Sequence, residues 1–108
     1  MTATNITAEQ LAALLAAVRS HLVITWTDAA LDTRLTGYIK RGISRINELG
    51  GAEFDFAVEC MPRDLLLERC RYFRSNAGEQ FERDYQPEIV SLRLSQEVAA
   101  YEAENTDV

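Results

Sequence analysis

Hydrophobic residues recur at intervals of three and four along the first part of the chain, which is the spacing of one face of an α-helix. Between residues 7 and 22 they form one narrow stripe: Leu11, Leu14, Leu15, Val18 and Leu22. Thr7 and Gln10 have the spacing of a capping box, in which two side chains satisfy amides exposed at a helix start. We therefore expect a first helix here. The β-branched and aromatic residues 23–26 should then form a short extended connection.

A second helix is predicted from about Asp28 to Leu49, and its apolar positions again share one face. These positions are Leu31, Leu35, Tyr38, Ile39, Ile46 and Leu49. Gly42 lies within the same face, where its missing side chain would let another helix approach closely. Gly50 and Gly51 should end the helix, because glycine readily adopts the left-handed conformation found at helix C-termini.

Pro62 suits the first turn of a third helix, where its missing amide hydrogen would have no partner. This helix is apolar on more than one side, through Leu65, Leu66, Leu67, Cys70, Tyr72 and Phe73. Such a helix should be central, or should contact a neighbouring subunit as well as its own core. Residues 76–78 break it. Apolar residues then return at helical spacing, with Pro87 at a kink or restart: Phe81, Tyr85, Ile89 and Leu92.

The end of the chain allows two interpretations. Val90, Leu92 and Leu94 alternate with polar residues as in a strand, whereas the segment up to Glu104 could continue as a helix. The predicted fold is mainly α: one domain over residues 1–108, a bundle of about four helices with short extended connections. Its C-terminal segment should be adaptable, and residues 1–6 and 103–108 should be flexible.

The formal net charge is −6, and the acids are unevenly placed. Residues 51–61 contribute −3 through Glu53, Asp55 and Glu59, and residues 87–108 contribute −4 through five acids against Arg93. Proteins that bind nucleic acid tightly usually carry a positive net charge, so tight DNA binding by a monomer is disfavoured.

No apolar run reaches the ~18 residues of a membrane span, so a membrane partner is not expected.

Residues with catalytic or metal-binding potential are few. Cys60 and Cys70 lack the spacing of a zinc or redox centre, and we interpret them as small buried apolar groups in a reducing cytoplasm. His21 is the single histidine, at the end of the first helix, where a cation is favourable. A carboxylate pair such as Glu79 and Glu82 stays open as an acid–base candidate. We expect no enzyme activity, catalytic residue, cofactor or metal.

Charged residues beside the apolar faces are candidates for subunit contacts. Arg34, Arg41 and Arg45 fall within a narrow arc of the second helix. They form either a solvated face or a contact with the acids at 53–59 of a neighbouring copy. Arg69 lies among apolar residues and should need an ion pair there, because an unpaired buried charge is costly. The full set of interface candidates is Arg34, Arg41, Arg45, Arg63, Asp64, Arg69, Arg71 and Arg74.

The order of these features resembles a known family. Residues 32–42 and 46–50 are similar to its second helix, and residues 63–72 with Asn76, Phe81, Tyr85 and Leu92 are similar to its following helices. This family is the head–tail connector, also called adaptor or head-completion protein, of long-tailed double-stranded DNA phages. The similarity covers roughly residues 25–95, and its motifs are patterns of helix-packing residues.

The resemblance implies a structural virion protein at the head–tail interface, assembled in the host cytoplasm. It implies a ring of about a dozen copies docked beneath the portal protein, which extends the DNA channel and receives a tail-side or stopper protein. An acidic lining would let the DNA pass without tight binding. Candidates for the lumen are Glu53, Asp55, Glu59, Glu88 and Glu97, and candidates for partner docking are Val90, Leu92, Leu94, Val98 and Tyr101.

Two alternatives stay open. The chain could be a small helical regulator or adaptor that binds one protein partner with the same apolar surplus. It could also be a helix-turn-helix protein that reads DNA with its third helix, which carries arginines. The overall acidity makes the second alternative the weaker one.

Overall fold

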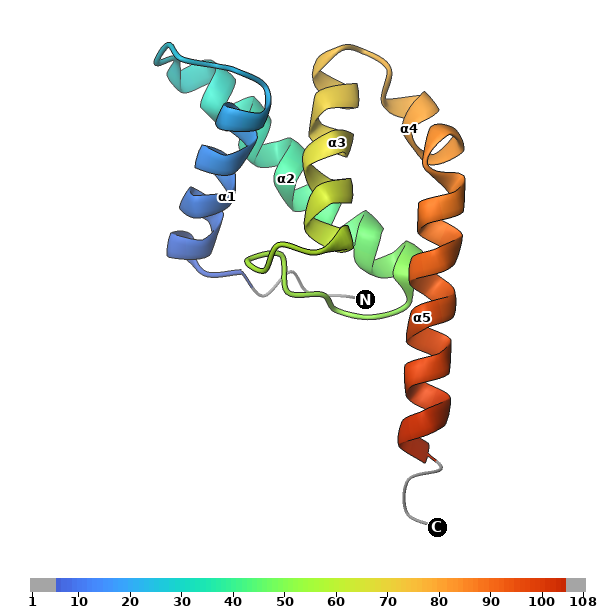
Figure 1. Cartoon of the computed structure of the whole chain (residues 1–108). Coiled ribbons are helices and arrows are strands. Elements are labelled where there is room, and N and C mark those ends of the chain that lie inside the picture. Colours follow the sequence, from blue (N-terminus) through green and yellow to red (C-terminus); the bar gives the residue numbers. More distant parts are fainter. Residues whose placement is uncertain (1–5, 105–108) are drawn as a thin grey trace.

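The computed structural model describes residues 6–104 and contains five α-helices in this range (Figure 1). They are α1 (Ala8–His21), α2 (Ala29–Gly50), α3 (Met61–Arg74), α4 (Gly78–Asp84) and α5 (Gln86–Glu104). No strand occurs in these residues, which confirms the predicted mainly α fold. Ile6 packs against the core, and residues 103–104 belong to α5. The remainder of the two segments predicted to be flexible lies outside the described residues.

Helix α1 begins with the predicted capping box. The Thr7 hydroxyl accepts a hydrogen bond from the Gln10 amide at 3.1 Å, and the Gln10 side chain accepts one from the Thr7 amide at 3.0 Å. After α1 the chain turns sharply rather than simply extending, because Val23 has a left-handed φ of 58°. Arg19 then links α1 to α2 through an ion pair with Asp32 at 2.7 Å.

Helices α2 and α3 cross in close contact at Gly42, as the sequence predicts. A Cβ atom at Gly42 would lie 2.5 Å from Cδ1 of Leu66, a side chain that is completely buried. Only glycine allows the two helices to come this close. At its other end α2 stops at Gly51, whose φ of 75° is the left-handed conformation of a helix cap.

Helix α3 is central, which confirms the prediction from its many apolar positions. It packs against α1, α2, α4 and α5. Leu65, Leu66 and Cys70 are buried, and Leu67 and Tyr72 are partly buried against the same core. The irregular segment before α3 places Phe56 in the core, and Arg63 holds this segment by donating to the Phe56 carbonyl at 3.1 Å.

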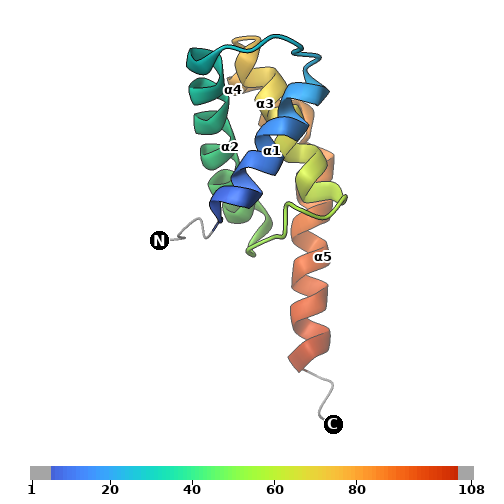
Figure 2. The same cartoon turned by 90° about the vertical axis from the view of Figure 1, so that its left-hand side faces the viewer.

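Helices α4 and α5 follow a break at Asn76, which has a left-handed φ of 58°. Pro87 lies in the first turn of α5, so it marks a restart, as expected. The C-terminal segment is helical, and its interpretation as a strand is wrong. In a helix, Val90 and Leu94 lie on the side opposite Leu92, so of these three residues only Leu92 faces the core. The distal half of α5 extends beyond the other helices (Figures 1 and 2).

Between residues 6 and 104, no helix combines the length and the hydrophobicity that membrane crossing requires.

Valine substitutions at two glycines of α2 test the close contact. Gly42→Val should lower the free energy of unfolding by about 1–3 kcal/mol, because the new side chain overlaps Leu66 in a packed core. Gly37→Val is the matched control, since its Cβ would meet only the flexible end of Arg41 at 3.4 Å. Denaturant unfolding measures both variants. Equal stabilities would show that the two helices can separate at little cost.

Candidate interaction surfaces

Helix α5 carries an apolar stripe on its outer side, which we define as Val90, Leu94 and Val98. These side chains are 45%, 54% and 54% exposed and follow one another at intervals of four residues. They line a shallow groove that continues from Pro87 to Glu102. Tyr101, also predicted for partner docking, is exposed one turn further on. Leu92 is a correction to that prediction, because it is only 7% exposed and belongs to the core.

A second surface lies where α2 and α3 cross, and it combines arginines with aromatic rings. We call Tyr38, Arg41, Arg69 and Phe73 the arginine–aromatic surface. The rings of Tyr38 and Phe73 lie 5.8 Å apart between centroids. The Arg69 guanidinium carbon is 4.2 Å from the Phe73 centroid, and that of Arg41 is 5.9 Å from the Tyr38 centroid. Arg34 is exposed one turn earlier on the same side of α2.

Arg69 is half-buried, and burial lowers the pKa of its guanidinium. Arg69 forms no ion pair with any residue between 6 and 104, so the ion pair that the sequence predicts for it at an interface stays a prediction. Its guanidinium lies over the Phe73 ring, whose face attracts a cation. Arg41 likewise has no ion pair among the described residues. The arginine–aromatic surface therefore carries positive charges that no direct ion pair among residues 6–104 neutralises.

Arg45 lies next to this surface but is neutralised within the chain. Its guanidinium donates two hydrogen bonds to Glu82 of α4, at 2.7 and 2.9 Å, and one to Glu48 at 2.6 Å. These contacts raise the pKa of Arg45, and the hydrogen bond from Arg45 lowers the pKa of Glu82. Arg45, a candidate for subunit contact, thus connects α2 to α4 in the single chain.

Glu68 is contacted by side chains from α1, from α3 and from the junction between α4 and α5. Arg71 donates to it at 2.7 Å, the Tyr85 hydroxyl at 2.6 Å, and Nε2 of His21 lies 2.6 Å away. The hydrogen bond from Arg71, followed by those from Tyr85 and His21, lowers the pKa of Glu68 to about 2. Donating to this carboxylate raises the pKa of Tyr85 to about 12. His21, the last residue of α1, therefore ties that helix to α3.

The other charged candidates lie at the surface or in connections. Arg74 is half-buried at the end of α3, and Asp64 is exposed in its first turn. The acids predicted for a channel lining, Glu53, Asp55, Glu59, Glu88 and Glu97, are all exposed. Asp55 accepts a hydrogen bond from the Ala57 amide at 3.0 Å. Glu97 contacts Arg93 at 3.4 Å, one turn earlier in α5.

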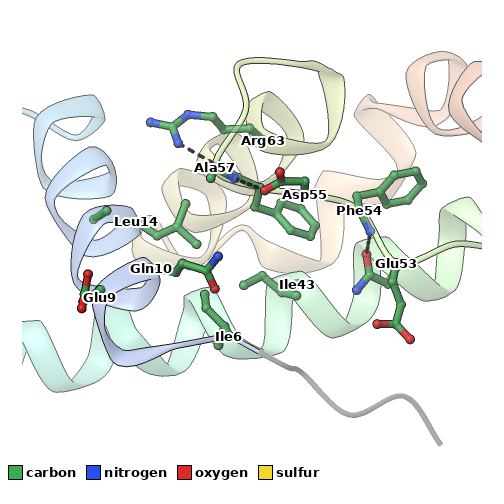
Figure 3. A pocket seen from close by; sticks show the side chains of 13 residues that line it. Ile6, Glu9, Gln10, Leu14, Ile43, Glu53, Phe54, Asp55, Ala57 and Arg63 are labelled. Atoms are coloured by element: carbon green, nitrogen blue, oxygen red, sulfur yellow. Dashed lines mark hydrogen bonds between the residues drawn. The ribbon is translucent and has the colours of Figure 1, made fainter.

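A cleft of about 420 Å³ opens between α1, α2 and the segment before α3. Figure 3 shows Leu14 and Ile43 along its walls and charged side chains such as Glu9 and Arg63 at its edges. The lining of this cleft comes from separate segments that only the fold brings together, so no pattern in the sequence indicates it. Its composition, apolar inside and charged at the rim, suits an apolar side chain of a partner.

The two cysteines differ in their surroundings. Cys70 is buried, as predicted, and burial raises the pKa of its thiol to about 12. Cys60 corrects the prediction, since it is only half-buried and its thiol donates to the Val58 carbonyl at 3.2 Å. Within residues 6–104, no group of His, Cys, Asp and Glu side chains has an arrangement that could hold a metal ion.

Comparison of the chain with protein-family models, with curated proteins and with solved structures finds no match. The resemblance to head–tail connectors therefore stays a prediction from the sequence. The α5 stripe and the arginine–aromatic surface are two candidate interaction surfaces that the structure shows independently of this resemblance.

Acid titration should reveal the contribution of Glu68. Because its folded pKa of about 2 lies below the ordinary 4.5, its stabilisation is complete above pH 4.5 and is lost as the pH falls towards 2. Glu68→Gln should therefore cost about 1–2 kcal/mol at neutral pH and progressively less on acidification. Chemical unfolding at several pH values measures this.

Glu48→Gln is the control for this experiment. It removes a carboxylate that is 69% exposed, so the loss should stay below about 1 kcal/mol. If Glu68→Gln and the wild type differ equally at pH 2 and pH 7, the Glu68 network does not contribute as its geometry indicates.

Proposed function

We propose that this chain is a structural assembly subunit, the head–tail connector of a long-tailed phage, which associates with copies of itself in a closed ring under the portal. The ring extends the DNA channel and offers a docking surface to a tail-side protein. The observation that carries the proposal is the α5 stripe on a helix that extends beyond its own bundle (Figure 2). The resemblance of residues 25–95 to the connectors gives the assembly its identity.

The α5 stripe supports association because the chain's own core cannot cover it. Leu92 faces the core from the inner side of α5, and the stripe occupies the opposite side. Fully burying one such apolar side chain contributes about 1.5–3 kcal/mol, so three of them are a substantial driving force. A contact between two different faces, repeated from copy to copy, generates a ring when the rotation closes.

The charge distribution supports the passage of DNA through such a ring. The exposed acids Glu53, Asp55 and Glu59 lie together on the segment before α3, and Glu88 and Glu97 lie along α5. Acids that face a channel repel phosphates, so the duplex slides without being held. The segment before α3 and α5 can present these acids because each element has an outer side that the other helices do not cover.

A second candidate function is that of a helical adaptor which binds one protein partner. The cleft beside Leu14 and Ile43 favours it, because its apolar walls and charged rim suit apolar side chains of a partner. In that case the α5 stripe would pair two copies or contact the same partner.

Electron microscopy of the purified chain, alone and mixed with portal rings, tests the proposed function directly. We expect closed rings with a central opening, either free or seated on the portal. A dimer that persists at every concentration and ignores the portal would favour the adaptor instead. Salt-dependent binding to duplex DNA at submicromolar affinity would replace both candidates with a DNA-binding protein.

A pair of substitutions on α5 tests whether the stripe drives the association. Leu94→Asp should abolish self-association, because it places a charge at the centre of the apolar contact, while the exposed position leaves the free energy of unfolding nearly unchanged. Ala100→Asp puts the same charge on another exposed position of α5, outside the groove, and should associate like the wild type. Sedimentation velocity and thermal unfolding measure both. Normal association of Leu94→Asp would assign the contact to another face.

A further inference from the structure

We infer that the arginine–aromatic surface of one copy receives the α5 stripe of a second copy. This inference rests on the proposed function and names the two faces that meet in the ring. It assigns Arg69, Arg41, Tyr38 and Phe73 to the receiving face, and α5 with its acids to the entering face.

The receiving face has a half-buried charge that forms no ion pair among residues 6–104, and Glu82, which pairs with Arg45, acts on it only through space. Arg69 is partly desolvated, lies over Phe73 and forms no ion pair among the described residues. Taking such a charge further out of water is costly unless a carboxylate neutralises it. An entering acid would supply this partner. Arginine and aromatic side chains are also the residue types that contribute most at the centres of protein interfaces.

The entering face has the complementary composition. The α5 stripe is flanked on a helical projection by Glu97 on one side and Glu102 on the other. Residues 87–108 carry a net charge of −4, from five acids and Arg93. The contact of Glu97 with Arg93 is exposed and 3.4 Å long, so exchanging it for a contact with another arginine costs little. Apolar side chains can then cover the rings while carboxylates meet the guanidinium groups.

The entering helix must come from another copy. Within one chain, α5 packs against the end of α2, where Leu92 lies 3.1 Å from a Cβ built at Gly50. The arginine–aromatic surface begins twelve residues earlier at Tyr38, about 18 Å along the helix. The distal part of α5 runs antiparallel to α3 and away from the end of α3 that carries Phe73 (Figure 1). The entering face and the receiving face are therefore different surfaces of the chain, as a contact that repeats around a ring requires.

A mixing experiment separates this arrangement from one in which the α5 stripes of two copies pair with each other. Leu94→Asp disables the entering face, and Arg69→Glu disables the receiving face. Each variant alone should associate roughly tenfold or more weakly than the wild type, because a buried charge pair or apolar contact is lost. Mixed together they should form a one-to-one complex, since the intact receiver of one binds the intact α5 of the other. Sedimentation velocity measures the species, and microscopy on portal rings gives the same comparison where the portal templates assembly.

The controls address folding and charge. Arg83→Glu reverses an exposed arginine on α4 and should associate like the wild type. Arg69→Gln removes the charge but keeps a long polar side chain beside Gly42, and it should weaken association while unfolding at the wild-type temperature. Combining Arg69→Glu with Glu97→Lys in one chain should restore part of the lost affinity, because the charge pair is rebuilt with opposite polarity.

The outcomes distinguish this inference from the proposed function. If Arg69→Glu and Arg69→Gln associate like the wild type while Leu94→Asp does not, α5 is received elsewhere and the inference fails, although ring assembly stands. If the mixture of Leu94→Asp and Arg69→Glu stays unassociated while each control assembles, the two faces do not meet. If the wild type forms no ring, even with the portal, both the proposed function and the inference are wrong.

Discussion

The close contact of α2 and α3 at Gly42 determines where the other helices lie. Because glycine leaves room for Leu66, α3 can lie directly on α2 and become the helix around which α1, α4 and α5 pack. The same crossing brings Arg69 and Phe73 of α3 next to Tyr38 of α2. The proposed receiving face is thus a direct result of how the core is packed. Its rings and charges are held by two helices rather than by loops, which favours a preformed contact.

The charged residues of this protein divide into two groups with different roles. Glu68 and Arg45 each connect separate helices: Glu68 joins α1 and the junction between α4 and α5 to α3, and Arg45 joins α2 to α4. Their partners are fixed within one chain. Arg41 and Arg69 lie over aromatic rings and form no ion pair among residues 6–104, and Glu88 and Glu97 of α5 are exposed. A chain that neutralises some arginines internally and leaves others over aromatic rings is well suited to bind a second, acidic surface.

Local signals in the sequence account for most of the fold. The Thr7 capping box, Gly51 and Pro87 fix helix ends by backbone chemistry that needs no tertiary context, and Gly42 indicates the close crossing. The choice between strand and helix at residues 90–94 could not be made, because Val90, Leu92 and Leu94 alternate as in a strand while Leu92 also continues the helical spacing that begins at Phe81. Ion-pair partners could not be predicted either, because the paired residues are far apart in the sequence. Arg45 and Glu82 are 37 residues apart, and His21 and Glu68 are 47 residues apart. Leu92 was wrongly predicted to be a docking residue because its burial depends on which side of α5 faces the core, and the sequence did not decide that residues 90–94 are helical.

The contrast between the two cysteines has a practical consequence. With a pKa of about 12 and no access to solvent, the Cys70 thiol stays protonated and is shielded from alkylating reagents. Cys60, half-buried at the start of α3, is the more accessible thiol. A maleimide dye would therefore attach mainly beside the acidic segment, and the unaltered sequence already provides a fluorescent reporter position outside the hydrophobic core.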